Sequence, residues 1–80
     1  MDKSEIITIV INETQSVVMK KLSPDQPLIS TRLLDSMGVV DLTTALEVAF
    51  NIKIEARDLI PQNFETIDNI VDYISRTLHG

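Results

Sequence analysis

The three prolines of this chain lie between segments whose apolar residues recur every three or four positions. Pro24 and Pro27 fall in one connection and Pro61 in another. Proline cannot continue a helix, because it lacks the N–H donor and clashes with the preceding turn. The segments that the prolines leave intact have the period of an α-helix. The expected fold is therefore an all-α bundle of three longer helices plus one short helix.

The apolar stripes predict where the helices lie. The first helix is expected from about Ser4 to Lys20 and the second from about Ser36 to Phe50. The stretch from Glu55 to Ile60 fits one short helical turn that Pro61 stops, and the last helix begins after Thr66, a favoured N-cap residue. The side chains expected to form the core are Ile6, Ile7, Val10, Thr14, Val17 and Val18, then Val39, Leu42, Leu46, Ala49 and Phe50, and finally Ile67, Ile70, Val71, Ile74 and Leu78.

Composition limits the kinds of site that the chain can build. Its 80 residues predict one domain, 1–80, and they include no cysteine and one histidine, His79. Disulfides and cysteine- or imidazole-based metal sites are therefore not expected, and the scattered carboxylates predict only weak surface binding of magnesium or calcium. Twelve Asp and Glu against 7 Lys and Arg give a surface that repels phosphate backbones, so nucleic acid is not an expected partner.

The sequence gives no sign of a membrane protein or of an enzyme. The apolar runs are too short to span a bilayer, and the N-terminus lacks the features of a signal peptide, so a cytoplasmic protein is expected. There is no Cys nucleophile, no second His and no GxSxG motif. Paired acids such as Asp68 and Asp72 have the spacing of a solvated helix face. The short termini favour a free-standing protein, and a monomer is expected.

The stretch LLDSMGVVDL, residues 33–42, is the most informative part of the chain. Asp35 and Ser36 are both favoured N-cap residues for the second helix. Gly38 would fall in its first turn at a cost of up to about 1 kcal/mol against alanine. Either something approaches the backbone there, or the first turn tolerates the loss. A helix N-terminus also suits an attached phosphate, so Ser36 is well placed to carry a phosphodiester.

Residues 34–54, LDSMGVVDLTTALEVAFNIKI, resemble the acyl carrier protein family, whose motif is Asp-Ser-Leu followed by the helical pattern xxxELxxALExxF. Met37 stands for the leucine and Asp41 for the glutamate, and the similarity extends in outline to TIDNIVDYI near the end of the chain. The positions that match directly are Leu42, Ala45, Leu46, Glu47 and Phe50, with Ile54 where the family commonly has isoleucine.

The resemblance implies a carrier. Ser36 would receive 4′-phosphopantetheine from coenzyme A through a magnesium-dependent phosphopantetheinyl transferase, and Asp35 would help to present the serine. The cargo would be an acyl or aminoacyl thioester, passed between loading and processing enzymes. The alternative is a helical interaction or docking module that shares the fold, has no attached group, and uses Ser36 only as a helix cap.

The second helix also suggests where partners would bind. The candidate partner face comprises Met37, Val40, Asp41, Thr44, Glu47 and Val48. The alternative is that Met37 and Val40 widen the core. Gly38, Val48 and Ala49 stand where fatty-acid carriers are often charged or polar, so the resemblance points to specialised pathways, including D-alanyl carriers and discrete polyketide or peptide carriers. Ile54, Leu59 and Ile60 either line an acyl pocket or, as favoured here, close the core.

Overall fold

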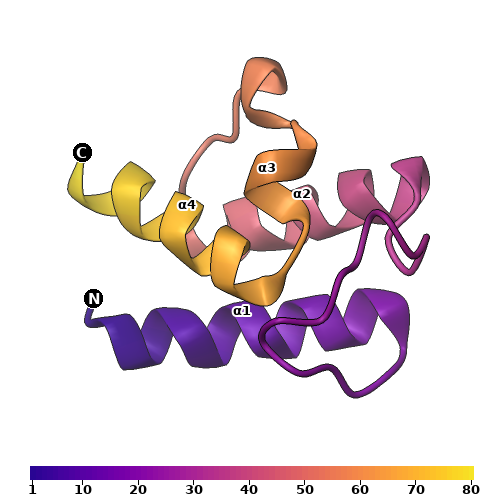
Figure 1. The fold of residues 1–80 in the computed structure, drawn as a ribbon. Helices are drawn as coiled ribbons and strands as arrows, with labels where there is room; N and C mark the ends of the chain where they lie inside the picture. Colours follow the sequence, from indigo (N-terminus) through magenta and orange to yellow (C-terminus); the bar gives the residue numbers. More distant parts are fainter.

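The computed structural model describes residues 1–80, and it is helical with no strands (Figure 1). The elements are α1 (Lys3–Val18), α2 (Ser36–Phe50), the 3-10 turn η1 (Ala56–Asp58), α3 (Pro61–Phe64) and α4 (Ile67–His79). Three of the α-helices are long and α3 is a single turn. The prediction of an all-α bundle is confirmed.

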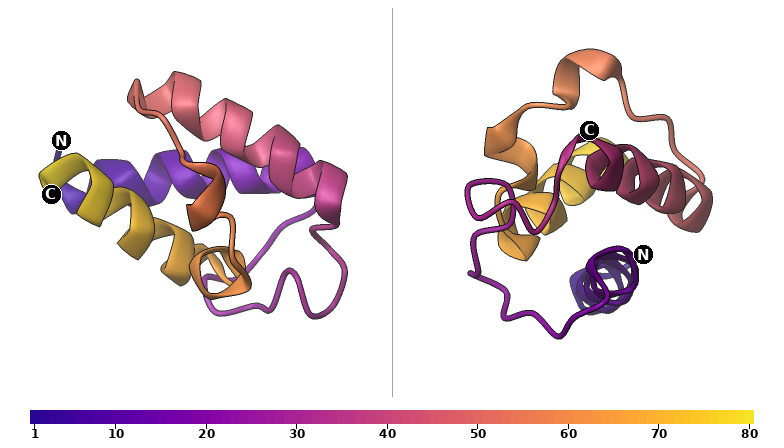
Figure 2. Two further views of the ribbon diagram at one scale, coloured as in Figure 1. Left: turned by 90° about the horizontal axis from the view of Figure 1, so that it is seen from above. Right: turned by 90° about the vertical axis from the view of Figure 1, so that its right-hand side faces the viewer.

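Helix α1 is the base of the bundle, and it packs against both α2 and α4, while α3 packs against α4. Figures 1 and 2 show α2 and α4 running back towards the end of the molecule where the chain begins. An ion pair of 3.8 Å between Lys3 Nζ and Asp72 Oδ1 joins α1 to α4. At the opposite end of the molecule, the long connection over residues 19–35 joins α1 to the start of α2.

Both ends of α1 follow from their capping residues. The side chain of Asp2 accepts a hydrogen bond from the N–H of Glu5 at 2.9 Å, so the helix begins at Lys3. Met19 adopts the left-handed conformation that commonly ends helices, with φ 57°. The helix therefore ends at Val18, two residues before the predicted Lys20, because the capping geometry outweighs the continuing helical pattern.

The core is formed by apolar side chains from all four α-helices and from the connections between them. Two positions expected in this core are instead exposed, Ile7 and Ala49. Successive residues of a helix point about 100° apart, so only Ile6 of the pair Ile6–Ile7, and only Phe50 of the pair Ala49–Phe50, faces inwards. The buried apolar residues are Ile6, Val10, Leu28, Leu34, Leu42, Leu46, Phe50, Ile54, Phe64, Ile67, Ile70, Val71, Tyr73 and Ile74.

Pro61 begins a helix instead of ending one. The predicted turn at Glu55–Ile60 is the shorter η1, and Pro61 occupies the first position of α3. Proline is favoured at that position because its missing N–H has no partner within the helix and its fixed φ already suits the helix. The expectation that Pro61 only stops a helical turn is therefore wrong, and α3 is a helix that the sequence pattern missed.

Candidate functional site

Asp35 sets the first residue of α2. Its Oδ1 accepts a hydrogen bond from the N–H of Gly38 at 2.8 Å, and its backbone oxygen accepts one from Val39 at 2.9 Å. This is the geometry of an N-cap, so Asp35 is the capping residue and Ser36 is the first residue of the helix. The Ser36 side chain is thereby left free of the capping role.

Gly38 is explained by the close packing of its own chain. A Cβ atom at this position would lie 3.2 Å from Leu34 Cδ2 and 3.3 Å from Asp35 Oδ1. Leu34 is buried, and Asp35 makes the capping hydrogen bond. Of the two readings of Gly38 from the sequence, a close approach to the backbone is the one that the structure supports, and the approaching groups are the side chains of Leu34 and Asp35.

The connection before α2 is held in place by Glu65, which lies between α3 and α4. Glu65 Oε1 accepts hydrogen bonds from the N–H groups of Ile29 at 2.8 Å and Ser30 at 3.0 Å, and its backbone oxygen accepts one from Leu28 at 2.7 Å. These bonds favour the carboxylate, and the Ser30 N–H contributes most to holding the pKa of Glu65 below its ordinary value. The approach to Ser36 is therefore an ordered segment.

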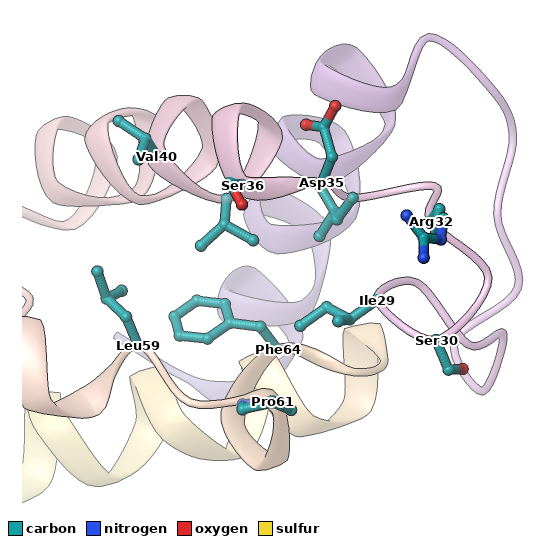
Figure 3. Close-up of a pocket in the computed structure, with 11 residues that line it drawn as sticks. Ile29, Ser30, Arg32, Asp35, Ser36, Val40, Leu59, Pro61 and Phe64 are labelled. Atoms are coloured by element: carbon teal, nitrogen blue, oxygen red, sulfur yellow. The ribbon is translucent and has the colours of Figure 1, made fainter.

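A groove of about 660 Å³ opens beside Ser36 (Figure 3). One wall is α2, the other carries Leu59, Pro61 and Phe64, and the loop before α2 closes one end. Apolar side chains make up about half of the lining, which gives a surface suited to a chain with both apolar and polar parts. The lining residues are Ile29, Ser30, Arg32, Leu34, Asp35, Ser36, Val39, Val40, Leu59, Pro61 and Phe64.

The Ser36 side chain is exposed and makes no hydrogen bond within the protein. The only neighbouring carboxylate that lines the groove belongs to Asp35, and Figure 3 shows it directed away from the groove. The Asp35 carboxylate caps α2 through Oδ1, and no side chain is hydrogen-bonded to the Ser36 hydroxyl as a general base would be. A nucleophilic reaction of Ser36 therefore needs a base from another molecule.

The residues of the candidate partner face do not all lie in the same environment. Met37, Val40 and Val48 are 69%, 52% and 79% exposed, so Met37 and Val40 do not widen the core. Asp41 and Thr44 are exposed as well. Glu47 differs, because it is half-buried and its Oε2 accepts a hydrogen bond from the N–H of Ile54 at 2.8 Å. That bond fixes the chain where it leaves α2.

The three residues considered for an acyl pocket lie in different environments. Ile54 is buried in the core, as favoured from the sequence. Leu59 and Ile60 are both exposed, at 38% and 43%, so the favoured expectation that they close the core is wrong for these two. Leu59 lines the groove and Ile60 does not. Sequence reasoning also missed Ile29 and Phe64 as groove residues. No periodic pattern links these positions, because the groove is assembled from segments far apart in the chain.

No group of three or more His, Cys, Asp or Glu side chains is arranged to hold a metal ion. None of the helices combines the length and the apolar character needed to cross a bilayer.

The sequence has relatives among known proteins over its whole length. Residues 5–74 match the family described as "Phosphopantetheine attachment site". The D-alanyl carrier protein of Streptococcus suis (strain 98HAH33) is 31% identical over 82 residues, covering 100% of both chains. The acyl carrier protein of Helicobacter hepaticus (strain ATCC 51449 / 3B1) is 32% identical over 74 residues, covering 92% of this chain and 95% of that protein.

A third relative is the D-alanyl carrier protein of Bacillus subtilis (strain 168), 30% identical over 73 residues, which covers 91% of this chain and 92% of that protein. The fold, the exposed serine and the relatives define a small helical carrier protein and not a catalyst. The chain belongs to the phosphopantetheine-binding carrier family, which bears 4′-phosphopantetheine covalently, and the resemblance noted from the sequence is confirmed.

Proposed function

We propose that Ser36 is the residue that carries 4′-phosphopantetheine. The observation that supports this assignment is the exposed Ser36 hydroxyl, which has no hydrogen bond to lose and opens on the groove. Asp35 supports it indirectly, since its cap fixes Ser36 at the first position of α2. Because Ser36 is exposed beside an open groove, these residues fit an attached arm.

The loading reaction then divides between two proteins. The Ser36 oxygen forms a bond to the phosphorus of coenzyme A that bears pantetheine, and the bond to the bridging oxygen breaks, which releases adenosine 3′,5′-bisphosphate. The serine proton passes to a base of the phosphopantetheinyl transferase, since this chain offers none. The attached arm supplies a terminal thiol, which a chain without cysteine lacks.

The cargo that we propose is a small acyl or aminoacyl group of a specialised pathway. The D-alanyl carrier relatives support this class, as they align with nearly all or all of the chain. The face of α2 supports a specialised pathway too, because it exposes Met37, Val40 and Val48 where fatty-acid carriers are often more acidic, and Asp41 is its one exposed acid. The protein would act as a monomer in the cytoplasm, where coenzyme A and the loading and processing enzymes meet.

We further propose that the partner face consists of Met37, Val40, Asp41, Thr44 and Val48. These exposed residues share the surface of α2 that extends from Ser36. Exposed apolar side chains gathered on one face are typical of surfaces that bind other proteins. Glu47 is left out of this face, because its carboxylate is already bonded to Ile54.

Intact-protein mass spectrometry tests the attachment residue. The chain is incubated with coenzyme A, magnesium and a broad-specificity phosphopantetheinyl transferase, and fragmentation locates the adduct. We expect a mass gain of one phosphopantetheine on Ser36, lost in Ser36→Ala and kept in Ser30→Ala, whose serine lines the same groove. No gain with several transferases on the folded chain would favour an unmodified docking module instead.

A further inference from the structure

Arg32 combines an unusual backbone conformation with a place on the groove beside Ser36. Its φ is 64°, in the left-handed region that glycine and asparagine tolerate and longer side chains rarely adopt. The other residues with positive φ are Met19 and Asn51, and both end a helix, where this conformation is common. Arg32 lies in the connection before α2, so helix capping does not account for it.

The backbone around Arg32 is held in this conformation by hydrogen bonds. The N–H of Arg32 donates to the oxygen of Ile29 at 3.0 Å, and the N–H of Leu34 donates to Leu28 at 2.9 Å. Ile29 is in turn bound by the Glu65 carboxylate. An arginine here keeps an unfavourable backbone geometry that glycine or asparagine would adopt more readily. Strain of this kind accumulates at functional sites.

The guanidinium of Arg32 has no partner within the chain. The one ion pair of the protein joins Lys3 to Asp72, and no hydrogen bond is made by the Arg32 side chain. Asp35, the only acid among the groove residues, points its carboxylate away from the groove (Figure 3). Arg32 is therefore an unpaired cation on a protein of net charge −5, and the only cation that lines the groove.

We infer that Arg32 is a positioning residue that pairs with the phosphodiester of the arm on Ser36. This inference rests on the proposed attachment at Ser36. A phosphodiester there introduces a negative charge on the groove side of α2, and the long, fork-shaped side chain of arginine suits phosphate oxygens. This pairing would hold the phosphate towards the loop that carries Arg32, so the first part of the arm would lie at that end of the groove.

The test uses the apo and fully loaded forms of the whole chain. Phosphorus-31 NMR reports on the phosphodiester, and the side-chain Nε–H signals report on the three arginines, Arg32, Arg57 and Arg76. Arg32→Asn removes the charge while suiting the left-handed backbone, and Arg32→Lys retains it. Arg57→Asn is the matched control, because Arg57 is exposed on η1 and does not line the groove.

We expect loading to shift the Nε–H signal of Arg32 but not that of Arg57. The phosphorus signal of loaded Arg32→Asn should differ from that of the unaltered chain, with Arg32→Lys between them and Arg57→Asn unchanged. High salt should reduce the difference, because an exposed ion pair is screened. An unmoved Arg32 signal and identical phosphorus signals would overturn the inference, as would an effect of Arg32→Asn confined to the rate of loading. Failure of the proposed attachment at Ser36 can be told apart from failure of this inference, because the mass of the chain would then not change on loading.

Discussion

Glu65 and Ile29 lie 36 positions apart in the sequence, yet the Glu65 carboxylate accepts a hydrogen bond of 2.8 Å from the Ile29 N–H. The same oxygen also binds Ser30. The junction between α3 and α4 thus holds the loop that closes one end of the groove and leads to Ser36. The Glu65 carboxylate therefore ties the junction of α3 and α4 to the loop that precedes Ser36.

This link predicts an acid-sensitive loop. The Ser30 N–H is the main cause of the lowered pKa of Glu65. The stabilisation from Glu65 is therefore complete above its ordinary pKa of 4.5 and is lost as the pH falls through the lower pKa of the folded chain. We expect the amide signals of Ile29 and Ser30 to titrate together in this range in an NMR experiment.

Glu65→Gln provides the control for that titration, because glutamine keeps an acceptor oxygen and does not ionise. The acid transition of the Ser30 amide should disappear in this variant. The Glu5 amide, which is bound by Asp2, should still titrate, since the pKa of Asp2 is lowered mainly by the Glu5 N–H. An unchanged Ser30 transition in Glu65→Gln would contradict the assignment to Glu65.

Features that depend on a few adjacent residues were predictable from the sequence. The bounds of α2 follow from Asp35 and the apolar stripe after it, and the predicted range matches the observed one. Pro61 shows the limit of such local signals, because proline is unfavourable inside a helix and favourable at its start. The pattern of residues 55–61 does not distinguish these positions.

Features built from distant segments could not be predicted in this way. The groove combines Ile29 and Arg32 of the loop with Phe64 of α3, and the bonds of Glu65 to the loop span 35 and 36 residues. A helical pattern identifies which face of a segment is apolar, but it does not say which loop will cover that face. The left-handed conformation of Arg32 is likewise set by its surroundings, since arginine does not favour it.

The substitution Gly38→Ala is predicted to stabilise the protein less than a Gly→Ala substitution in a helix usually does. A helical Gly→Ala substitution normally stabilises by about 1 kcal/mol. Here the new Cβ would lie 3.2 Å from the buried Leu34 and 3.3 Å from the capping oxygen of Asp35. We expect Gly38→Ala to give clearly less than the usual gain in urea unfolding. The gain in stability from Gly38→Ala should be larger in an Asp35→Ala background, where one of the two close contacts is absent. A gain of the usual size in the unaltered chain would contradict this account.

Tyr73 is predicted to stabilise the segment that carries Leu59. Its hydroxyl donates a 2.9 Å hydrogen bond to Asp58 Oδ2, and burial, followed by that bond, raises its pKa above 10.0. The stabilisation from this phenol is thus complete below pH 10.0 and lost as the pH rises through the folded pKa. Tyr73→Phe should cost about 1 kcal/mol and speed hydrogen exchange at the Leu59 amide. Unaltered exchange there would count against the role of this bond.

The packing of α2 predicts a large contrast between its two faces. Leu46 is fully buried, whereas Val48 is 79% exposed. Leu46→Ala should destabilise by about 2–5 kcal/mol, which is a large part of the roughly 5–15 kcal/mol of a typical domain. Val48→Ala should change stability by less than about 0.5 kcal/mol. Urea unfolding of both variants measures the contrast, and similar losses would mean that α2 is packed differently.

Glu47 is predicted to affect the stability of the protein and Met37 its loading by the transferase, although both were candidates for the partner face. Glu47→Ala removes the acceptor of the Ile54 N–H, so it should cost about 1 kcal/mol of stability. At a temperature where the variant remains folded, it should load at nearly the normal rate.

Met37→Ala should show the reverse. Met37 is 69% exposed beside Ser36, so its loss should leave the urea midpoint unchanged and lower kcat/KM for loading by the transferase. Thr8→Ala, on the exposed surface of α1, serves as the control for loading. Normal loading of Met37→Ala, or slow loading of folded Glu47→Ala, would contradict the partner face proposed here, because each result would show that a different set of α2 residues meets the transferase.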